Sequence, residues 1–253
     1  MIHFESVTRK YGRKVAVANL DLEISSGELF AFLGPNGAGK TTTIRMLVGL
    51  LRPSKGRIRV CGHDTVNDTR QATRFLGYVP DESFLYEKLS GREFLQFVAE
   101  MRGLSRAETA DGIAREVERF DLADYLDDLI ESYSHGMKQR LVFASALVHD
   151  PPVLVVDEPT VGLDPRSVRL VKDLMRARAA AGKIVFMSTH TLSIAEEVAD
   201  RIGIIDRGNL NFLGTLDKLR DEMSLQQRSL EHLFLELTAE DDCHGNPARG
   251  APS

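Results

Sequence analysis

Hydrophobic and polar positions follow two different periods along this 253-residue chain. From Ile2 to Val7 and from Leu20 to Ile24, apolar residues alternate with polar ones, which is the two-residue period of half-buried strands. Residues 28–33 form a short apolar run of strand type. We therefore predict that residues 2–33 are β-structure.

Strand-like and helix-like segments alternate through much of the remaining chain. Strands are expected at 56–60, 75–79, 153–156 and 184–187, and helices at about 42–51, 166–181 and 193–200. The first of these helices should stop before Pro53. Two apolar runs, 202–205 and 210–212, flank Asp206-Arg207-Gly208-Asn209 and predict a hairpin. Because strands that alternate with helices form parallel sheets covered on both faces, the sequence predicts an α/β fold with a mostly parallel sheet.

Residues from about 90 to 149 have helical character instead. Ser105 and Glu108 form a capping box that opens a helix with one apolar face, so we predict a helical subdomain inserted into the α/β core. Near the end, four apolar residues share helical spacing and predict a helix that packs back on the core: Leu230, Leu233, Phe234 and Leu237. Residues 239–253 are polar, contain Gly and Pro, and are expected to be a disordered tail.

A glycine-rich loop joins the 28–33 strand to the helix that follows it. Its pattern is G-x-x-x-x-G-K-T, the phosphate-binding loop, in the strand–loop–helix context that this motif requires. Its glycines let backbone N–H groups converge on an anion, and the helix N-terminus adds its positive dipole end. The residues expected to contact the nucleotide are Gly34, Pro35, Asn36, Gly37, Ala38, Gly39, Lys40, Thr41 and Thr42. Lys40 should reach the β- and γ-phosphates, and the Thr41 hydroxyl should bind Mg²⁺; the alternative is a plain Gly-rich turn.

Two carboxylates, Asp157 and Glu158, directly follow the fully apolar run 153–156. In a chain with a phosphate loop, a carboxylate at the end of such a strand is the second half of a Mg-nucleotide site. We expect Asp157 to hold Mg²⁺ through its water shell and Glu158 to polarise the attacking water as general base. A polar turn after a strand is the alternative, which the phosphate loop disfavours.

A third motif begins at Ser134, which is an ordinary N-cap for the helix that follows. A helix N-terminus with a free hydroxyl and the Gly136 amide is also an anion site.

Composition limits the class of protein. With 43% hydrophobic and 27% charged residues the chain is an ordinary globular mixture, and its net charge of −5 gives no overall attraction to nucleic acid. Cys61 and Cys243 lie far apart in sequence and outside any C-x-x-C pair, so neither a disulfide framework nor a zinc site is expected. A reducing cytosol is the expected compartment. No signal peptide is visible, and no apolar run approaches the roughly 20 residues that span a bilayer.

Together, the glycine loop, the apolar-strand Asp-Glu and the earlier Ser-x-Gly helix start resemble the ATP-binding subunit of ABC transporters over residues 2–237. The variant Ser-His-Gly-Met-Lys-Gln-Arg resembles the branch that powers exporters with separate membrane subunits. The resemblance implies a P-loop NTPase core with an N-terminal antiparallel β subdomain, extending over residues 2–238, and a Mg²⁺-dependent ATPase.

The same resemblance implies partners and a location. Two copies, or a copy and a paralogue, would pair head to tail around two ATP molecules. Both would work through a polytopic membrane permease made as a separate chain, at the cytoplasmic face of the cell membrane, with no nucleic-acid partner. The transported substrate is set by that permease.

The resemblance also implies residue roles. Tyr11 would stack on adenine, and Ser134 and Gly136 would contact the γ-phosphate of the ATP held by the other subunit. Gly162-Leu163-Asp164 would cross the dimer interface, with Asp164-Pro165 also opening a helix. His190 would contact the γ-phosphate and steady the attack geometry; a structural His is the alternative.

The chain departs from the family pattern at three positions. Asp81 stands where the family usually has the Gln that reaches Mg²⁺. A carboxylate is also an oxygen ligand for a hard cation, so metal contact is expected, with slower turnover from the added charge; Glu82 is an alternative one residue on. His135 and Met137 replace the commonest Gly and Gln, and because the Ser and the second Gly remain, the anion contact should persist.

Two points stay open from sequence. The aromatic and apolar residues Phe84, Leu85, Tyr86 and Phe94 either form a groove for the membrane partner or belong to the helical core. Two other functions are alternatives. One is a soluble ABC-type ATPase acting on ribosomes or DNA, although such proteins usually have tandem cassettes or long coiled-coil inserts. The other is a nucleotide-binding regulator with little catalysis.

Overall fold

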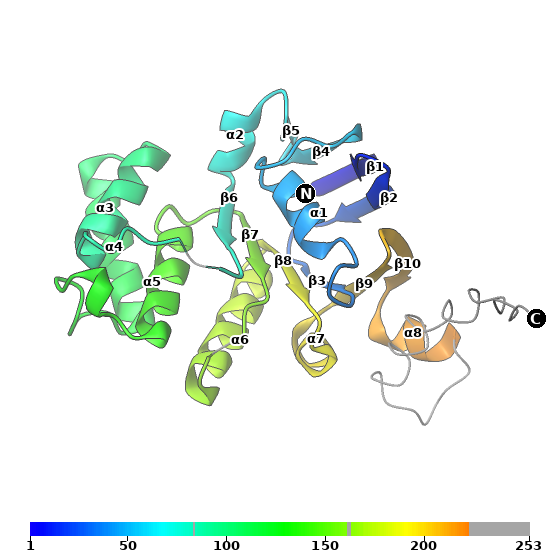
Figure 1. Ribbon diagram of the computed structural model, residues 1–253. Helices are drawn as coiled ribbons and strands as arrows, with labels where there is room; N and C mark the ends of the chain where they lie inside the picture. Colours follow the sequence, from blue (N-terminus) through cyan, green and yellow to red (C-terminus); the bar gives the residue numbers. More distant parts are fainter. Residues whose placement is uncertain (83, 161–162, 223–253) are drawn as a thin grey trace, which may run out of the picture.

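The strands are divided between two sheets, one antiparallel and one mostly parallel. The computed structural model describes residues 1–82, 84–160 and 163–222 (Figure 1). The four-stranded sheet has the order β2-β1-β4-β5 and antiparallel pairing throughout. Its strands are β1 (Ile2–Tyr11), β2 (Lys14–Ile24), β4 (Lys55–Val60) and β5 (His63–Asp64). The predicted N-terminal antiparallel β subdomain is therefore confirmed, with the later strand β4 added to it.

The six-stranded sheet carries the core, in the order β10-β9-β3-β8-β7-β6. Its strands are β3 (Leu29–Leu33), β6 (Leu76–Val79), β7 (Val153–Asp157), β8 (Ile184–Thr189), β9 (Arg201–Asp206) and β10 (Asn209–Gly214). All neighbours are parallel except the β9–β10 hairpin. Every residue of β3, β7 and β8 is buried, which explains their unbroken apolar runs, because both faces of such a sheet are covered.

Alternate residues of β3 face two different cores. Leu29, Ala31 and Leu33 pack in the same core as the helices on one face of the sheet, whereas Phe30 and Phe32 pack against the first helix and the antiparallel sheet. The core helices are α1 (Lys40–Leu47), α2 (Thr69–Arg74), α6 (Pro165–Ala180), α7 (Leu192–Val198) and α8 (Leu216–Glu222). The sheet is thus sandwiched, as the alternation of strands and helices predicted.

Three helices form a group at one end of the molecule, away from the antiparallel sheet (Figure 1). They are α3 (Gly91–Arg102), α4 (Arg106–Phe120) and α5 (His135–Leu147), with a short 3₁₀ turn at Ile130–Ser132. The capping box predicted at Ser105 and Glu108 is present, and Ser90 forms a second one with Glu93. The predicted inserted helical subdomain is therefore confirmed.

Two details differ from the sequence predictions. Helix α1 ends at Leu47 rather than near Leu51, because Gly49 adopts φ +78°, a left-handed conformation that ends helices. The short helix α2 was not predicted from the sequence. The helix predicted around residues 230–237 and the tail 239–253 lie outside the described residues. Within the described ranges, no helix combines the length and the apolarity needed to cross a bilayer.

Candidate active site

Parallel strands bring three separate segments to one edge of the six-stranded sheet. Leu33 of β3 is paired with Thr189 of β8, and Asp157 of β7 is paired with Ser188 of the same strand. The phosphate loop, the Asp-Glu pair and His190 therefore follow neighbouring strands at their carboxyl ends, where open α/β sheets bind ligands.

The phosphate loop has the backbone that its glycines allow. Gly37 and Gly39 adopt φ +84° and +116°, and a Cβ on Gly39 would lie 2.5 Å from the Ala16 carbonyl oxygen. The Lys40 side chain crosses the loop, and its Nζ donates to the carbonyl oxygens of Gly34 at 2.6 Å and Pro35 at 3.2 Å. With 6% exposure, Lys40 is a buried ammonium already aimed into the loop.

Asp157 is a buried carboxylate whose two oxygens differ in their hydrogen bonding. Its Oδ1 accepts a hydrogen bond from the Ser188 hydroxyl, while its buried Oδ2 has no hydrogen-bond partner among the described residues. Burial raises the pKa of Asp157, and hydrogen bonding from Ser188 and Thr41 offsets only part of that rise. A buried carboxylate oxygen beside a threonine hydroxyl is a donor set that suits a hard cation, so these residues fit Mg²⁺.

Glu158 lies between the two nitrogen-bearing side chains of the site. Its Oε1 is 3.6 Å from Lys40 Nζ and 3.0 Å from His190 Nδ1, and its Oε2 accepts from the His190 backbone N–H at 3.4 Å. The backbone of Glu158 has φ +51°, an unfavourable conformation for a side chain with a Cβ. Its N–H bond to the Ser188 carbonyl oxygen, at 3.1 Å, helps to hold that turn.

The phosphate loop and Glu158 line a cleft of about 280 Å³, whereas Asp157 lines a neighbouring groove of about 570 Å³ that it shares with Thr41 and Asp81. Of the residues predicted to bind nucleotide or metal, the cleft is lined by Tyr11, Pro35, Asn36, Gly37, Gly39, Lys40, Thr41, Thr42, Asp81 and Glu158. Tyr11 is 47% exposed, and the Arg9 guanidinium lies over its ring, 4.6 Å from the centroid. Lys14 also lines the cleft; no sequence signal singled it out, because only the fold of the β1–β2 turn brings it here.

Ser134 and Asp164, two of the other predicted contacts, cap helices elsewhere in the chain. Ser134 is exposed and caps α5, accepting from the Met137 N–H at 3.3 Å. Asp164 caps α6, accepting from the Arg166 and Ser167 N–H groups at 2.9 and 3.1 Å. Neither residue, nor Gly136, is among the described residues that line the cleft, and the same is true of Gly34, Ala38, Asp157 and His190. Gly162 lies outside the described residues.

Comparison with known proteins gives consistent matches. A family model described as ABC transporter matches residues 17–161. The daunorubicin resistance ATP-binding protein DrrA3 of Streptomyces coeruleorubidus is 39% identical over 221 residues, covering 87% of this chain and 70% of that protein. The Nod factor export ATP-binding protein I of Cupriavidus metallidurans is 38% identical, covering 82% of this chain and 69% of its own length.

Two solved structures share the fold. One, an ATP-binding subunit of an ABC transporter, has a TM-score of 0.88 at 32% identity and covers 94% of this chain and 99% of its own. Another is a dimeric ATP-binding cassette in a post-hydrolysis state, bound to ADP and Pi, with a TM-score of 0.75 at 25% identity, covering 85% of this chain and 99% of that one.

Proposed function

The chain belongs to the ABC transporter family of ATP-binding subunits, and from that premise we propose that it hydrolyses ATP between two copies to drive export through a separate membrane permease. The observation that carries this proposal is the convergence of the phosphate loop, Asp157, Glu158 and His190 at one sheet edge. The export direction is supported by relatives whose names refer to drug resistance and Nod factor export.

Each side chain at the edge has a chemical task in this proposal. Lys40, buried and charged, neutralises the β- and γ-phosphates in place of the loop carbonyls it now contacts. Glu158 accepts the proton of the attacking water, and His190, 3.0 Å from it, orients that carboxylate and the γ-phosphate. Tyr11, which lines the cleft and is 47% exposed, offers its ring for stacking on adenine.

Magnesium would be held by the Thr41 hydroxyl and Asp157, with Asp81 lining the same groove of about 570 Å³. When bound, it would neutralise negative charge on the phosphates. The carboxylate at 81 brings a charge that a Gln would lack, so turnover slower than with Gln is expected.

The second half of the nucleotide site comes from the other copy. Ser134 and Gly136 stand at the start of α5, where backbone N–H groups favour an anion, yet they do not line the cleft of their own chain. A head-to-tail dimer joins the two halves. A dimeric post-hydrolysis cassette among the similar structures supports this assembly.

A groove beside the nucleotide cleft is our candidate for permease docking. It has a volume of about 570 Å³ and is lined by Leu50, Phe84 and Phe94, and also by the proposed magnesium ligands Thr41, Asp81 and Asp157. Phe84 is 86% exposed and Leu50 is 70% exposed, whereas Phe94 is only 6% exposed and belongs to the core. Each of the two alternatives from the sequence therefore applies to a different residue. Phe84 is on the surface, where a partner could bind, and Phe94 belongs to the helical core. Exposed aromatic anchors of this kind are typical of protein interfaces.

The experiment is co-purification from detergent extracts of cells that express the tagged full chain. We expect one polytopic membrane protein to be recovered, and Phe84→Asp to lower its recovery strongly. Leu129→Asp, at an apolar position that is 45% exposed and outside the groove, is the matched control. Recovery of ribosomes in place of a membrane protein would reject the transporter assignment.

A further inference from the structure

The nucleotide cleft is lined by a second lysine, Lys14, in addition to the lysine of the phosphate loop. Lys14 is the first residue of β2 and its side chain is exposed. Its ammonium has no hydrogen bond or ion pair with any residue that the structure describes. None of the sequence motifs of the site includes this residue, so its charge has no task in the site as assigned above.

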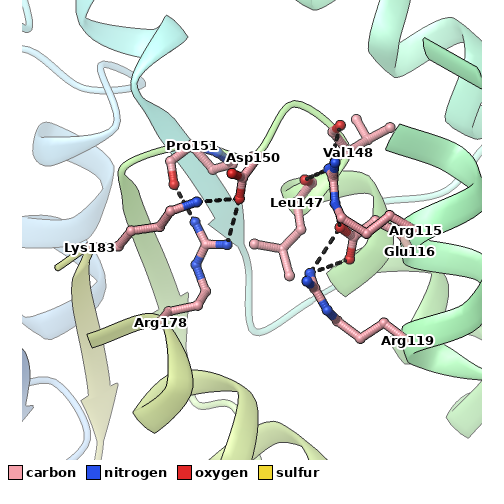
Figure 2. Close-up of polar contacts among 9 residues, drawn as sticks. All are labelled: Arg115, Glu116, Arg119, Leu147, Val148, Asp150, Pro151, Arg178 and Lys183. Carbon is pink, nitrogen blue, oxygen red and sulfur yellow. Dashed lines mark hydrogen bonds and ion pairs between the residues drawn. The ribbon is translucent and has the colours of Figure 1, made fainter. Parts of the chain in front are cut away.

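Many cations elsewhere in the molecule have partners within the chain. Figure 2 shows four of them at the amino edge of the six-stranded sheet, with the carboxylates and carbonyl groups that they contact. Arg178, for example, lies 3.2 Å from Asp150 and also donates to the Pro151 carbonyl oxygen. In the nucleotide cleft, Lys40 donates to the Gly34 carbonyl oxygen at 2.6 Å. An unpaired ammonium on the wall of the cleft differs from these groups, because its charge is available to a ligand.

The β1–β2 hairpin places Lys14 beside the proposed adenine-stacking residue. Lys14 pairs with Tyr11 across the hairpin, and directly opposed residues of an antiparallel pair have neighbouring side chains. Two residues further along β2, Ala16 also lines the cleft. Ala16 lies against the phosphate loop, since a Cβ on Gly39 would be 2.5 Å from its carbonyl oxygen. Strand β2 therefore leads from Tyr11 to the phosphate loop, and Lys14 is at the Tyr11 end.

The two ends of the cleft differ in charge. Asp81 and Glu158 are the acids among the described residues that line it. Both belong to the phosphate-loop end, because Asp81 shares the neighbouring groove with Thr41, and Glu158 is 3.6 Å from Lys40. The Tyr11 end therefore has a lysine and no carboxylate among the described lining residues, which favours a negatively charged part of a ligand there.

The order of groups in a nucleotide identifies that part. With the base on Tyr11 and the β- and γ-phosphates at Lys40, the ribose and the α-phosphate lie between the two residues. Lysine carries its ammonium on a flexible four-carbon stem, so Lys14 can reach the α-phosphate from the Tyr11 end. The γ-phosphate is farther away, at the end of the cleft that has Glu158.

We propose that Lys14 binds the α-phosphate of the nucleotide through a charge-assisted hydrogen bond. This inference rests on the proposed function, because it takes the ATP site and the stacking role of Tyr11 as given. The α-phosphate is common to ATP, ADP and AMP, whereas the phosphate loop and Lys40 contact the phosphates in which these nucleotides differ. Lys14 thus adds affinity without distinguishing ATP from ADP, and helps to keep the nucleotide on its chain after hydrolysis.

Nucleotide affinities of the full chain test the proposal, measured by displacement of a fluorescent ATP analogue. Lys14→Gln should weaken the binding of Mg-ATP, Mg-ADP and AMP by one common factor, about 3- to 10-fold, because a charged hydrogen bond is lost at a solvent-exposed position. Arg13→Gln is the matched control, at an exposed position of the same turn that is not among the described residues lining the cleft. It should bind all three nucleotides as the native chain does.

Two further measurements separate a direct contact from a displaced Tyr11 ring. Lys14→Arg keeps the positive charge and should retain most of the native affinity. Added salt should reduce the difference between Lys14→Gln and the native chain, because salt screens an exposed charge contact. A difference that stays the same up to about 1 M salt, where the screening length is about 3 Å, would overturn the proposed contact.

Other results would also overturn the proposal, and they distinguish it from the proposed function. Unchanged affinities in Lys14→Gln, or equal losses in Lys14→Gln and Arg13→Gln, would reject the role of Lys14, while Mg-ATP binding by the native chain would keep the proposed function. A loss for Mg-ATP alone would assign the ammonium to the γ-phosphate, and a loss for Mg-ATP and Mg-ADP but not AMP would assign it to the β-phosphate. A native chain that binds none of the three would reject the proposed function together with this inference.

Discussion

The carboxylates at the two edges of the six-stranded sheet differ in whether they are paired with cations. At the carboxyl edge, Asp157 is buried with one oxygen unpaired among the described residues. At the amino edge, Asp150 is shared by Arg178 and Lys183, and the buried Glu116 is shared by two arginines. Leaving a buried carboxylate unpaired is unfavourable for folding. In the proposed function, bound magnesium balances the carboxylate at the carboxyl edge, whereas ion pairs within the chain balance the carboxylates at the amino edge.

The largest expected effect concerns the carboxyl edge. Glu158→Gln removes the proposed general base, so the ATPase rate should fall by about 10²–10⁴-fold, while Lys40 and the loop keep their contacts and ATP binding should persist. Steady-state phosphate release and fluorescent-nucleotide binding measure the two quantities. Glu118→Gln, an exposed change on α4, is the control and should keep normal turnover. Full activity of Glu158→Gln would remove this residue from the chemistry.

The next effect is a pH dependence at the amino edge. Burial, followed by the charge of Arg102, lowers the pKa of His149 from its usual 6.5 to about 4. The folded state therefore holds His149 neutral, and this contribution to stability is complete above pH 6.5 and lost as the pH falls toward 4. The loss amounts to about 3 kcal/mol. Urea unfolding across this pH range should show that loss in the native chain and not in His149→Gln, whereas His3→Gln, at a half-exposed position, should keep the native slope.

A smaller effect should come from the paired carboxylate of the amino edge. Lysine and arginine hydrogen bonds lower the pKa of Asp150 although burial opposes them. Asp150→Asn removes the negative charge opposite the buried Arg178. The backbone of residue 150 has φ +47°, which asparagine tolerates as aspartate does. We expect the free energy of unfolding to fall by about 1–2 kcal/mol, discounted because Asp150 is 50% exposed.

The smallest expected effect is a gain in stability, opposite in sign to the loss expected for Asp150→Asn. Asp157→Asn removes a buried charge whose raised pKa shows that burial disfavours it. In metal-free buffer the variant should be more stable than the native chain by about 1 kcal/mol. In magnesium and ATP the order should reverse, because the native chain gains ligand stabilisation that the variant lacks. Destabilisation of Asp157→Asn in metal-free buffer would contradict the proposed contrast between the edges.

The sequence predicted what depends on short stretches of chain. Strands β3 and β7 follow from continuous apolar runs, and the phosphate loop follows from glycine spacing, because its geometry is local. The pairing of Asp150 with Arg178 and Lys183 could not be predicted, since it joins three segments through the tertiary fold. The same holds for Lys14 at the nucleotide cleft, which depends on how the β1–β2 turn folds over the loop.

In the proposed function, each nucleotide-binding site is formed by residues of two chains. The molar mass of the Glu158→Gln variant in Mg-ATP distinguishes this arrangement from a site formed by one chain. Light scattering with bound-nucleotide analysis should give twice the 28.1 kDa chain mass with two ATP molecules per dimer. The dimer should be lost when Ser134→Glu places a carboxylate at the tip of α5. A monomer with one bound ATP at saturating Mg-ATP would contradict the account.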